Sequence, residues 1–193
     1  MHDQRIVAGT MPKSELIYYV ATSLDGFIAT ADGGIDWLAP FEGGTQDYGY
    51  AAFIDRIDAV VMGSATYEKC LGFGEWPYAG KRVWVLSSRD LDAVDADVTI
   101  TPDEPGAVMR ELEAQGLRRV WLAGGGLVAG EFRRHGLITG YIVSVIPVVL
   151  GNGIPLLGHS GDQEQLELVE SRAYPDGIVQ LHYRPLDPDT LSS

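Results

Sequence analysis

Short apolar runs alternate with amphipathic stretches along most of this chain. The apolar runs are rich in β-branched and aromatic residues and end at glycine or polar turns, which is typical of buried strands. They predict strands at residues 16–21, 59–62, 82–86, 97–100, 119–123 and 138–149. Helical spacing, together with start and stop signals, predicts helices at 46–56, 63–71 and 105–115, and one that follows the glycines at 124–126 and ends near 136.

This order predicts an α/β fold of three α/β/α layers around a mostly parallel mixed sheet. Strands that alternate with helices pair in parallel and are covered on both faces. Residues 167–173 and 177–184 flank the turn Pro175-Asp176-Gly177 and predict an antiparallel hairpin at the C-terminal end. We expect one domain at 15–186, with a flexible arm at 1–14 and a tail at 187–193.

Composition narrows the classes of function. Glycine supplies 24 of 193 residues, yet 46% of the chain is apolar, so the glycines are expected to shape turns within a folded domain. The formal charge of −13 argues against nucleic acid or a membrane as a partner. A single cysteine, Cys70, excludes an internal disulfide, and the four histidines lack ligand spacing, so no metal is expected. Without a signal core or a long apolar span, we expect a cytoplasmic protein.

Candidate chemistry lies where three predicted strands end. Gly63-Ser64-Ala65-Thr66 and Gly124-Gly125-Gly126 each open a helix, and Ser87-Ser88-Arg89 follows another strand. Helix N-termini offer N–H groups to phosphate, and glycine allows phosphate to approach the backbone closely. Two alternatives remain open, since Ser64 and Thr66 could cap a helix and the triple glycine could be a packing turn. The match of residues 124–129 to G-x-G-x-x-A is weak, because no acid follows at the end of the next strand.

Six short motifs, in order, cover about residues 15–184: SLDGFIA at 23–29, DW at 36–37, VMGSATYE at 61–68, VLSSR at 85–89, AGGG at 123–126 and PVVLGNGIPLL at 147–157. Each motif is weak alone, and the ordered set is specific. The chain resembles the dihydrofolate reductase-like superfamily. The most similar branch contains the C-terminal reductase domain of riboflavin biosynthesis enzymes and stand-alone reductases.

This resemblance implies NADPH as the hydride donor, with NADH as the alternative. It places Ala21 and Ile28 at the nicotinamide carboxamide, and residues 29–38 on a loop that closes over the nicotinamide. The remaining cofactor positions that it implies are Gly63, Ser64, Ala65 and Thr66 at the pyrophosphate, Ser87, Ser88 and Arg89 at the 2′-phosphate, and Gly124, Gly125, Gly126 and Leu127 beside the nicotinamide and pyrophosphate. One departure stands out, because the family usually has arginine or lysine where this chain has Ser64, which leaves Arg89 as the cation for the 2′-phosphate.

The same resemblance points to three substrate-side residues. Asp47 occupies the position of the acid that binds the pterin ring and helps supply a proton, and its alternative is a helix N-terminal acid. Trp37 either faces the substrate or belongs to the core. Asp25 is the third substrate candidate, with a structural role in the turn as its alternative.

The predicted activity is hydride transfer from NADPH or NADH to a C=N or C=O group. The predicted substrate is a pterin, a folate or a ribosylaminopyrimidine-type heterocycle. The alternative is a non-catalytic protein that binds a nucleotide or heterocycle on the same fold. A homodimer is also expected, with residues 142–150 as a candidate surface.

Overall fold

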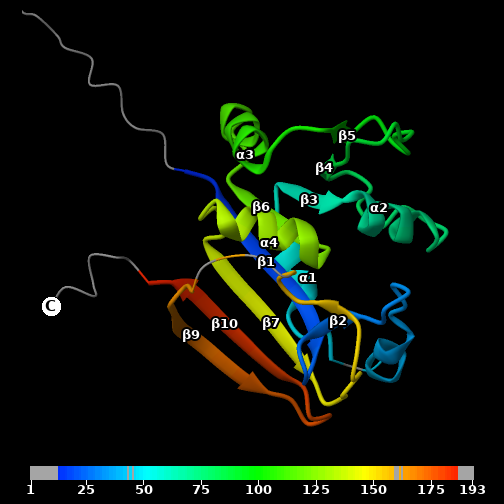
Figure 1. Ribbon diagram of the computed structural model, residues 1–193, viewed down its shortest axis with the longest axis vertical. Coiled ribbons are helices and arrows are strands. Elements are labelled where there is room, and N and C mark those ends of the chain that lie inside the picture. Colours follow the sequence, from blue (N-terminus) through cyan, green and yellow to red (C-terminus); the bar gives the residue numbers. More distant parts are fainter. Residues whose placement is uncertain (1–12, 43, 45, 159–160, 162, 187–193) are drawn as a thin grey trace, which may run out of the picture.

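A mixed eight-stranded sheet forms the centre of the molecule (Figure 1). The computed structural model describes residues 13–42, 44, 46–158, 161 and 163–186. The strand order is β5-β4-β3-β6-β1-β7-β10-β9, and a separate small sheet pairs β2 with β8. The strands are β1 (Glu15–Ser23), β2 (Phe27–Ala29), β3 (Ala59–Gly63), β4 (Arg82–Leu86), β5 (Val98–Thr101), β6 (Arg119–Gly124), β7 (Gly140–Ile146), β8 (Ile154–Pro155), β9 (Leu166–Ala173) and β10 (Val179–Pro185). The helices are the 3-10 helix η1 (Asp36–Phe41), α1 (Tyr50–Asp55), α2 (Ser64–Leu71), α3 (Pro105–Ala114) and α4 (Gly126–Arg134).

The sheet is parallel from β5 to β7, and the hairpin β9–β10 adds an antiparallel edge. The predicted α/β fold class is therefore confirmed. Strand β1 pairs with β6 only as far as Tyr18, opposite Leu122, whereas it pairs with β7 as far as Ser23. The last part of β1 thus has an unpaired side toward β6. In parallel sheets, ligands bind at this kind of opening near the carboxyl ends of strands.

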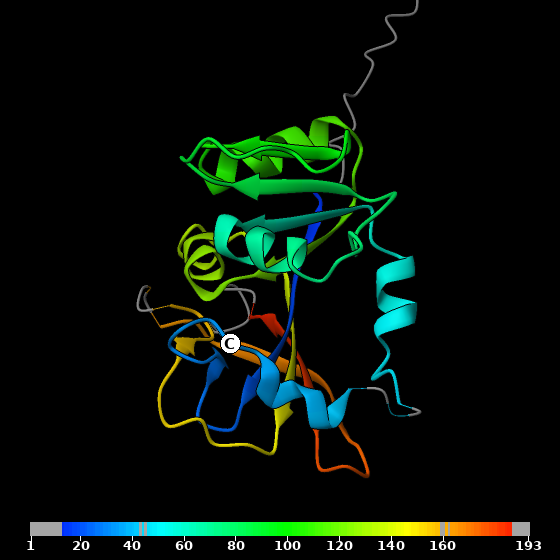
Figure 2. The ribbon, with the colours of Figure 1, turned by 90° about the vertical axis from the view of Figure 1, so that its right-hand side faces the viewer.

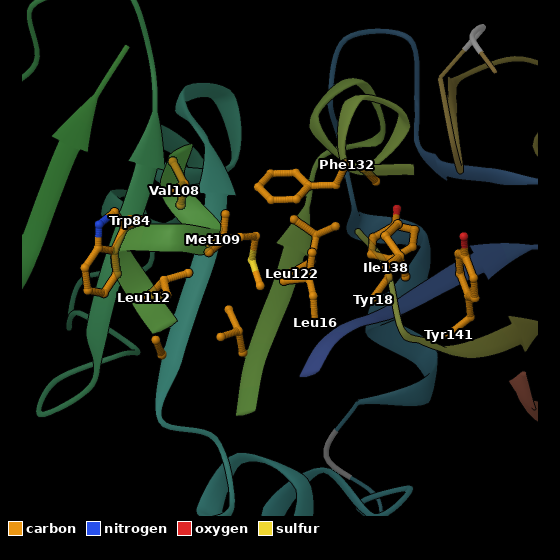
Figure 3. Packing of buried hydrophobic residues seen from close by; sticks show 14 residues of the cluster. Leu16, Tyr18, Trp84, Val108, Met109, Leu112, Leu122, Phe132, Ile138 and Tyr141 are labelled. Atoms are coloured by element: carbon orange, nitrogen blue, oxygen red, sulfur yellow. The ribbon is translucent and has the colours of Figure 1, made fainter. Parts of the chain in front are cut away.

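Helices α3 and α4 cover one face of the sheet. Their apolar side chains pack on alternate residues of the central strands, as Figure 3 shows for Leu16, Leu122, Met109 and Phe132. Leu16, Leu122 and Phe132 are fully buried. Successive residues of a strand point to opposite faces of the sheet, so a continuous run of β-branched and aromatic residues supplies apolar side chains to both faces.

Helices α1 and α2 cover the other face. Figure 2 shows α1 and α4 on opposite sides of the strands. Phe53 from α1 and Tyr67 from α2 pack there against Val60, Met62 and the ring of Trp121. A third, smaller cluster joins Ile146, Tyr174 and Ile178, with residues of η1 packed against it.

Two predicted elements are shorter than expected. The predicted helix at 46–56 begins only at Tyr50, because Tyr48 and Gly49 adopt left-handed backbone angles, φ 53° and 80°. Those angles cannot continue a right-handed helix. The predicted strand at 138–149 spans only Gly140–Ile146, and Pro147, which has no N–H to donate to a ladder, follows its end.

The sequence analysis did not predict the small elements β2, β8 and η1. Ser14, the last residue of the predicted arm, is buried, and its hydroxyl donates to the carbonyl of Leu117 at 2.5 Å. The rest of the predicted arm, apart from Lys13, and the predicted tail lie outside the described residues. In the described part of the chain, no helix is long and apolar enough to cross a membrane, and no group of three or more His, Cys, Asp or Glu residues could hold a metal ion.

Candidate active site

The N-termini of α2 and α4 meet at the carboxyl edge of the sheet. Helix α2 starts directly after β3, and α4 starts directly after β6, which is the neighbouring strand. A Cβ atom added at Gly125 would lie 3.5 Å from Thr66 Oγ1, and one added at Gly63 would lie 2.7 Å from Val128 Cγ2. The two turns are therefore in contact, and the predicted phosphate-binding segments are brought together.

Neither of these helices has a side-chain cap. The N-cap positions are Gly63 and Gly125, and neither makes a side-chain hydrogen bond. The capping alternative for Ser64 is wrong, because Ser64 is the first residue of α2 rather than its N-cap. The first N–H groups of both helices thus retain their capacity to bind an anion.

The packing alternative for the triple glycine is confirmed for Gly126. A Cβ atom there would lie 2.0 Å from the carbonyl oxygen of Pro155, so the chain at β8 passes over this residue. Gly124 has φ +112°, a backbone angle that residues with a side chain rarely adopt. Gly125, in contrast, has φ −78° and ψ −172°, which any residue adopts, and it follows a cis peptide bond from Gly124. A Cβ atom there would make only a van der Waals contact, with Thr66 Oγ1. Leu127, the next predicted cofactor residue, is 72% exposed at this edge.

The Ser87-Ser88-Arg89 loop follows β4, further along the same edge. Its own hydrogen bonds fix it, since the N–H of Arg89 donates to Ser87 Oγ at 3.0 Å. The guanidinium of Arg89 forms a two-pronged ion pair with Glu68 of α2, with N···O distances of 3.0 and 2.7 Å. Arg89 holds the pKa of the Glu68 carboxyl below its usual range, so the carboxyl is ionised at neutral pH. The predicted 2′-phosphate cation therefore already has an acidic partner.

A mostly apolar cavity of about 310 Å³ lies beside the last part of β1. We call it the ring cavity, because five aromatic side chains line it. Its lining residues are Tyr19, Val20, Ala21, Leu38, Phe41, Glu42, Asp47, Tyr48, Tyr50, Trp121, Ser144, Ile146 and Ile178. A planar ring system could fill it with stacking or edge contacts.

A hydrogen-bonded wall closes the ring cavity on the side of the hairpin. Gln180 is buried, and the two N–H groups of its Nε2 are shared among three acceptors, Tyr19 Oη at 3.2 Å, the carbonyl of Tyr48 at 3.1 Å and Ser144 Oγ at 3.1 Å. The Tyr48 hydroxyl also donates to the carboxylate of Asp176, and this contact raises the pKa of Tyr48 to about 12. The wall holds Tyr48 in its left-handed conformation, which is uncommon for a non-glycine residue.

Asp47 lines the ring cavity and lies two residues before Gly49, the N-cap of α1. Its carboxylate accepts the N–H of Gly49 at 3.0 Å and the N–H of Ala51 at 3.2 Å. These two bonds, that of Gly49 first, hold the pKa of the Asp47 carboxyl below its usual range. The bond to Ala51, in the first turn of α1, supports the alternative of an acid at the helix N-terminus, and the role as a proton source stays a prediction.

The other predicted substrate-side residues occupy different places. Trp37 packs with the small cluster around Ile146 and Ile178, and it is not among the residues that line the ring cavity. Leu38 and Phe41 of the same 3-10 helix line the cavity instead. Of the two predicted carboxamide residues, Ala21 lines the ring cavity, and Ile28 lies in β2.

Asp25 holds two loops together. Its carboxylate accepts the hydroxyl of Ser23 at 2.6 Å and the N–H groups of Leu150 at 3.0 Å and Gly151 at 2.6 Å. The Ser23 bond, with help from these backbone N–H groups, lowers the pKa of Asp25 to about 2. Its structural alternative is therefore supported, and a substrate contact stays a prediction.

Sequence comparison assigns the chain to a family. A model described as the RibD C-terminal domain matches residues 14–180, which is most of the chain. The chain belongs to the RibD C-terminal domain family. The uncharacterized protein YwjB of Bacillus subtilis (strain 168) is 36% identical over 168 residues, which cover 86% of this chain and 95% of that protein. The riboflavin biosynthesis protein RibD of Corynebacterium ammoniagenes is 30% identical over 72% of this chain and 44% of that longer protein.

Solved structures of RibD-like proteins share the fold. A putative riboflavin biosynthesis protein from Shewanella sp. PV-4 has a TM-score of 0.82 and 29% identity, and covers 90% of this chain and 99% of that chain. A diaminohydroxyphosphoribosylaminopyrimidine deaminase/5-amino-6-(5-phosphoribosylamino)uracil reductase from Thermotoga maritima has a TM-score of 0.69 and 16% identity. The similarity covers 57% of that longer chain. This member of the RibD C-terminal domain family therefore has the fold of a reductase of the riboflavin pathway type.

Within this RibD C-terminal domain, sequence reasoning missed most of the ring cavity. One signal was present, because Tyr19 and Ala21 are two residues apart on β1 and must share a face. Tyr18 points to the opposite face, where its hydroxyl donates to the carbonyl of Leu156 at 2.7 Å. Tyr48 and Gln180 are 132 residues apart, and no local pattern indicates that they meet.

Asp25 is expected to make the stability of this RibD C-terminal domain depend on pH in the acid range. Its pKa is about 2 in the folded chain and near 3.8 when unpaired, so ionised Asp25 stabilises the fold above about pH 4. That contribution is lost as the pH falls from about 4 to about 2. We expect Asp25→Asn to lower the urea midpoint at pH 7 and the difference from wild type to shrink toward pH 2. Asp36→Asn is the control, and a difference for Asp25→Asn that persists at pH 2 would contradict this account.

Proposed function

We propose that this protein is a reductase that transfers hydride from NADPH to a C=N or C=O group of a flat nitrogen heterocycle. One observation carries this proposal, namely that two uncapped helix N-termini meet beside the unpaired end of β1 and the ring cavity. The family and its solved relatives support the same reading, since a neighbour of this fold is described as a reductase. When bound, NADPH supplies the hydride.

The residues of the edge fit a dinucleotide. In this proposal the pyrophosphate binds the backbone N–H groups at the uncapped starts of α2 and α4, at Gly63, Ala65 and Thr66 and at Gly125. In a chain of charge −13, these neutral donors favour an anion without a cluster of cations. Arg89 binds the 2′-phosphate in this proposal, together with Ser87 and Ser88.

The ring cavity orients the substrate. Its aromatic side chains exclude water and hold the ring beside the end of β1, where Ala21 would meet the nicotinamide. Asp47 is ionised at neutral pH because of its lowered pKa, and it therefore accepts a hydrogen bond from a ring N–H. The proton that completes the reduction comes from water at the mouth of the cavity, where Glu42 and Asp47 are exposed.

Nucleotide binding followed by turnover tests the proposal. Titration with NADPH and NADH should change the tryptophan fluorescence, because Trp121 lines the ring cavity. Binding below millimolar concentration, followed by oxidation of NADPH in the presence of a reducible pterin or aminopyrimidine, is the expected result. If neither nucleotide binds below millimolar concentration, the proposal is wrong. Binding without oxidation across a panel of heterocycles would establish the alternative of a non-catalytic binding protein.

The ion pair between Arg89 and Glu68 should set the preference between the two nucleotides. We expect Arg89→Ala to raise the Kd of NADPH about tenfold and to leave that of NADH nearly unchanged, because only NADPH has the 2′-phosphate. Glu68→Gln should tighten NADPH binding several-fold, since the carboxylate no longer competes for the guanidinium. Isothermal titration calorimetry of both variants with both nucleotides measures this, and equal effects on the two nucleotides would place the 2′-phosphate elsewhere.

A further inference from the structure

The ring cavity has no basic side chain among its described lining residues. Its only charged residues are Glu42 and Asp47, and both are exposed where the cavity opens. The neighbouring residues Gly43 and Thr45, which lie outside the described part, carry no charge. A ligand in the cavity therefore meets aromatic faces, the hydroxyls of tyrosine and serine side chains, and a negative mouth.

The basic residues of this region line a different groove. That groove, of about 290 Å³, contains Arg56, Arg119, Arg172 and His182, with Glu170 as its acid. It lies on the other side of the wall formed by Tyr19, Tyr48 and Gln180, since Tyr19 and Tyr48 line both spaces.

This wall separates the arginines from the ring cavity. Gln180 is only 5% exposed, and its amide nitrogen holds Tyr19, Tyr48 and Ser144 together. A substituent on a ring in the cavity would have to break these buried and partly buried hydrogen bonds to reach Arg56 or Arg172 through the wall. Breaking buried polar contacts is costly, so we expect the wall to persist when a ligand binds.

We propose that the ring cavity accepts an unphosphorylated heterocycle, uncharged or positively charged, and discriminates against a phosphorylated one. This inference rests on the proposed function and deepens it by naming the class of substrate. The proposed substrate differs from the one in the name of the Thermotoga maritima protein, which includes a phosphoribosyl group. Phosphate at the mouth would meet two carboxylates and no described cation, whereas an aromatic ring gains contacts on several sides.

Neopterin and neopterin monophosphate are suitable probes, because they share one bicyclic ring and side chain and differ by a single phosphate. Pterin fluorescence measures binding of each probe to the protein without nucleotide, at low ionic strength. We expect neopterin to bind about tenfold more tightly than its monophosphate. In the double variant Glu42→Gln/Asp47→Asn the ratio should fall below about threefold. The control variant Glu75→Gln/Asp90→Asn removes the same charge outside the cavity lining and should keep the tenfold ratio.

Several outcomes would overturn the proposal. Equal or tighter binding of the monophosphate would do so. If the variant Arg56→Ala/Arg172→Ala then lost that binding, the phosphate would be shown to reach the neighbouring groove. If the ratio of affinities stayed unchanged in the double variant, the two carboxylates would not be the cause of the discrimination. If neither probe bound, the cavity would not be a site for a heterocycle of this kind. Separate titrations with NADPH on the same protein distinguish these outcomes from failure of the proposed reductase function.

Discussion

Gly125→Val is expected to raise the Kd of NADPH at least a hundredfold while the protein stays folded. Gly125 is the N-cap of α4, and its Cβ position faces Thr66 at the N-terminus of α2, 3.5 Å away. A valine side chain would therefore stand between the two helix starts, where the proposed pyrophosphate binds. Loss of two charge-assisted hydrogen bonds, about 1.5 to 3 kcal/mol each, accounts for a change of this size. Fluorescence titration measures the affinity.

We expect the fold to survive this change because the φ and ψ of Gly125 suit any residue and its added Cβ meets only Thr66 Oγ1, at van der Waals distance. Far-UV circular dichroism and the Tm check this, and Gly125→Ala gives a smaller insertion at the same position. Gly106→Val is the matched control. It also sits in the first turn of a helix, α3, and its Cβ would have its nearest neighbour, Arg110 Nη1, at 3.5 Å. Unchanged NADPH affinity in a folded Gly125→Val variant would show that the pyrophosphate does not bind at α4.

The sequence allowed the edge of the site to be predicted because that edge is built from local signals. A strand, a glycine and a helix start follow one another within a few residues at Gly63 and again at Gly125. Parallel strands place their carboxyl ends at one edge, so two such turns must be near each other. A Cβ atom added at Gly125 would lie 3.5 Å from Thr66 Oγ1, and this short distance between the two turns could not be predicted from the pattern alone.

The ring cavity could not be predicted in the same way, because its walls come from distant segments. Tyr48 contacts Gln180 because strand β10 pairs with β7, which brings the two residues together. No sequence pattern indicates the left-handed backbone at Tyr48. The pair formed by Arg89 and Glu68 joins the loop after β4 to helix α2, 21 residues away in the chain, so no local pattern indicates it. The role of Arg89 toward the 2′-phosphate stays a prediction, and no signal in the sequence indicated that Glu68 competes for its guanidinium.

Gly126→Ala should destabilise the fold strongly, although alanine is the better helix former by about 1 kcal/mol. The added Cβ would lie 2.0 Å from the carbonyl oxygen of Pro155, and 3.5 Å from the amide nitrogen of Gly158, so backbone must move on one side. Overpacking of this kind costs about 3 kcal/mol, which lowers the Tm by roughly 6 to 12 °C in a protein of this size. Gly125→Ala, one residue earlier, has room for its Cβ and should leave the Tm within about 2 °C. Differential scanning calorimetry of the two variants compares them directly. Equal melting temperatures would mean that the segment at Pro155 yields easily and that the packing of β8 over α4 does not require glycine at position 126.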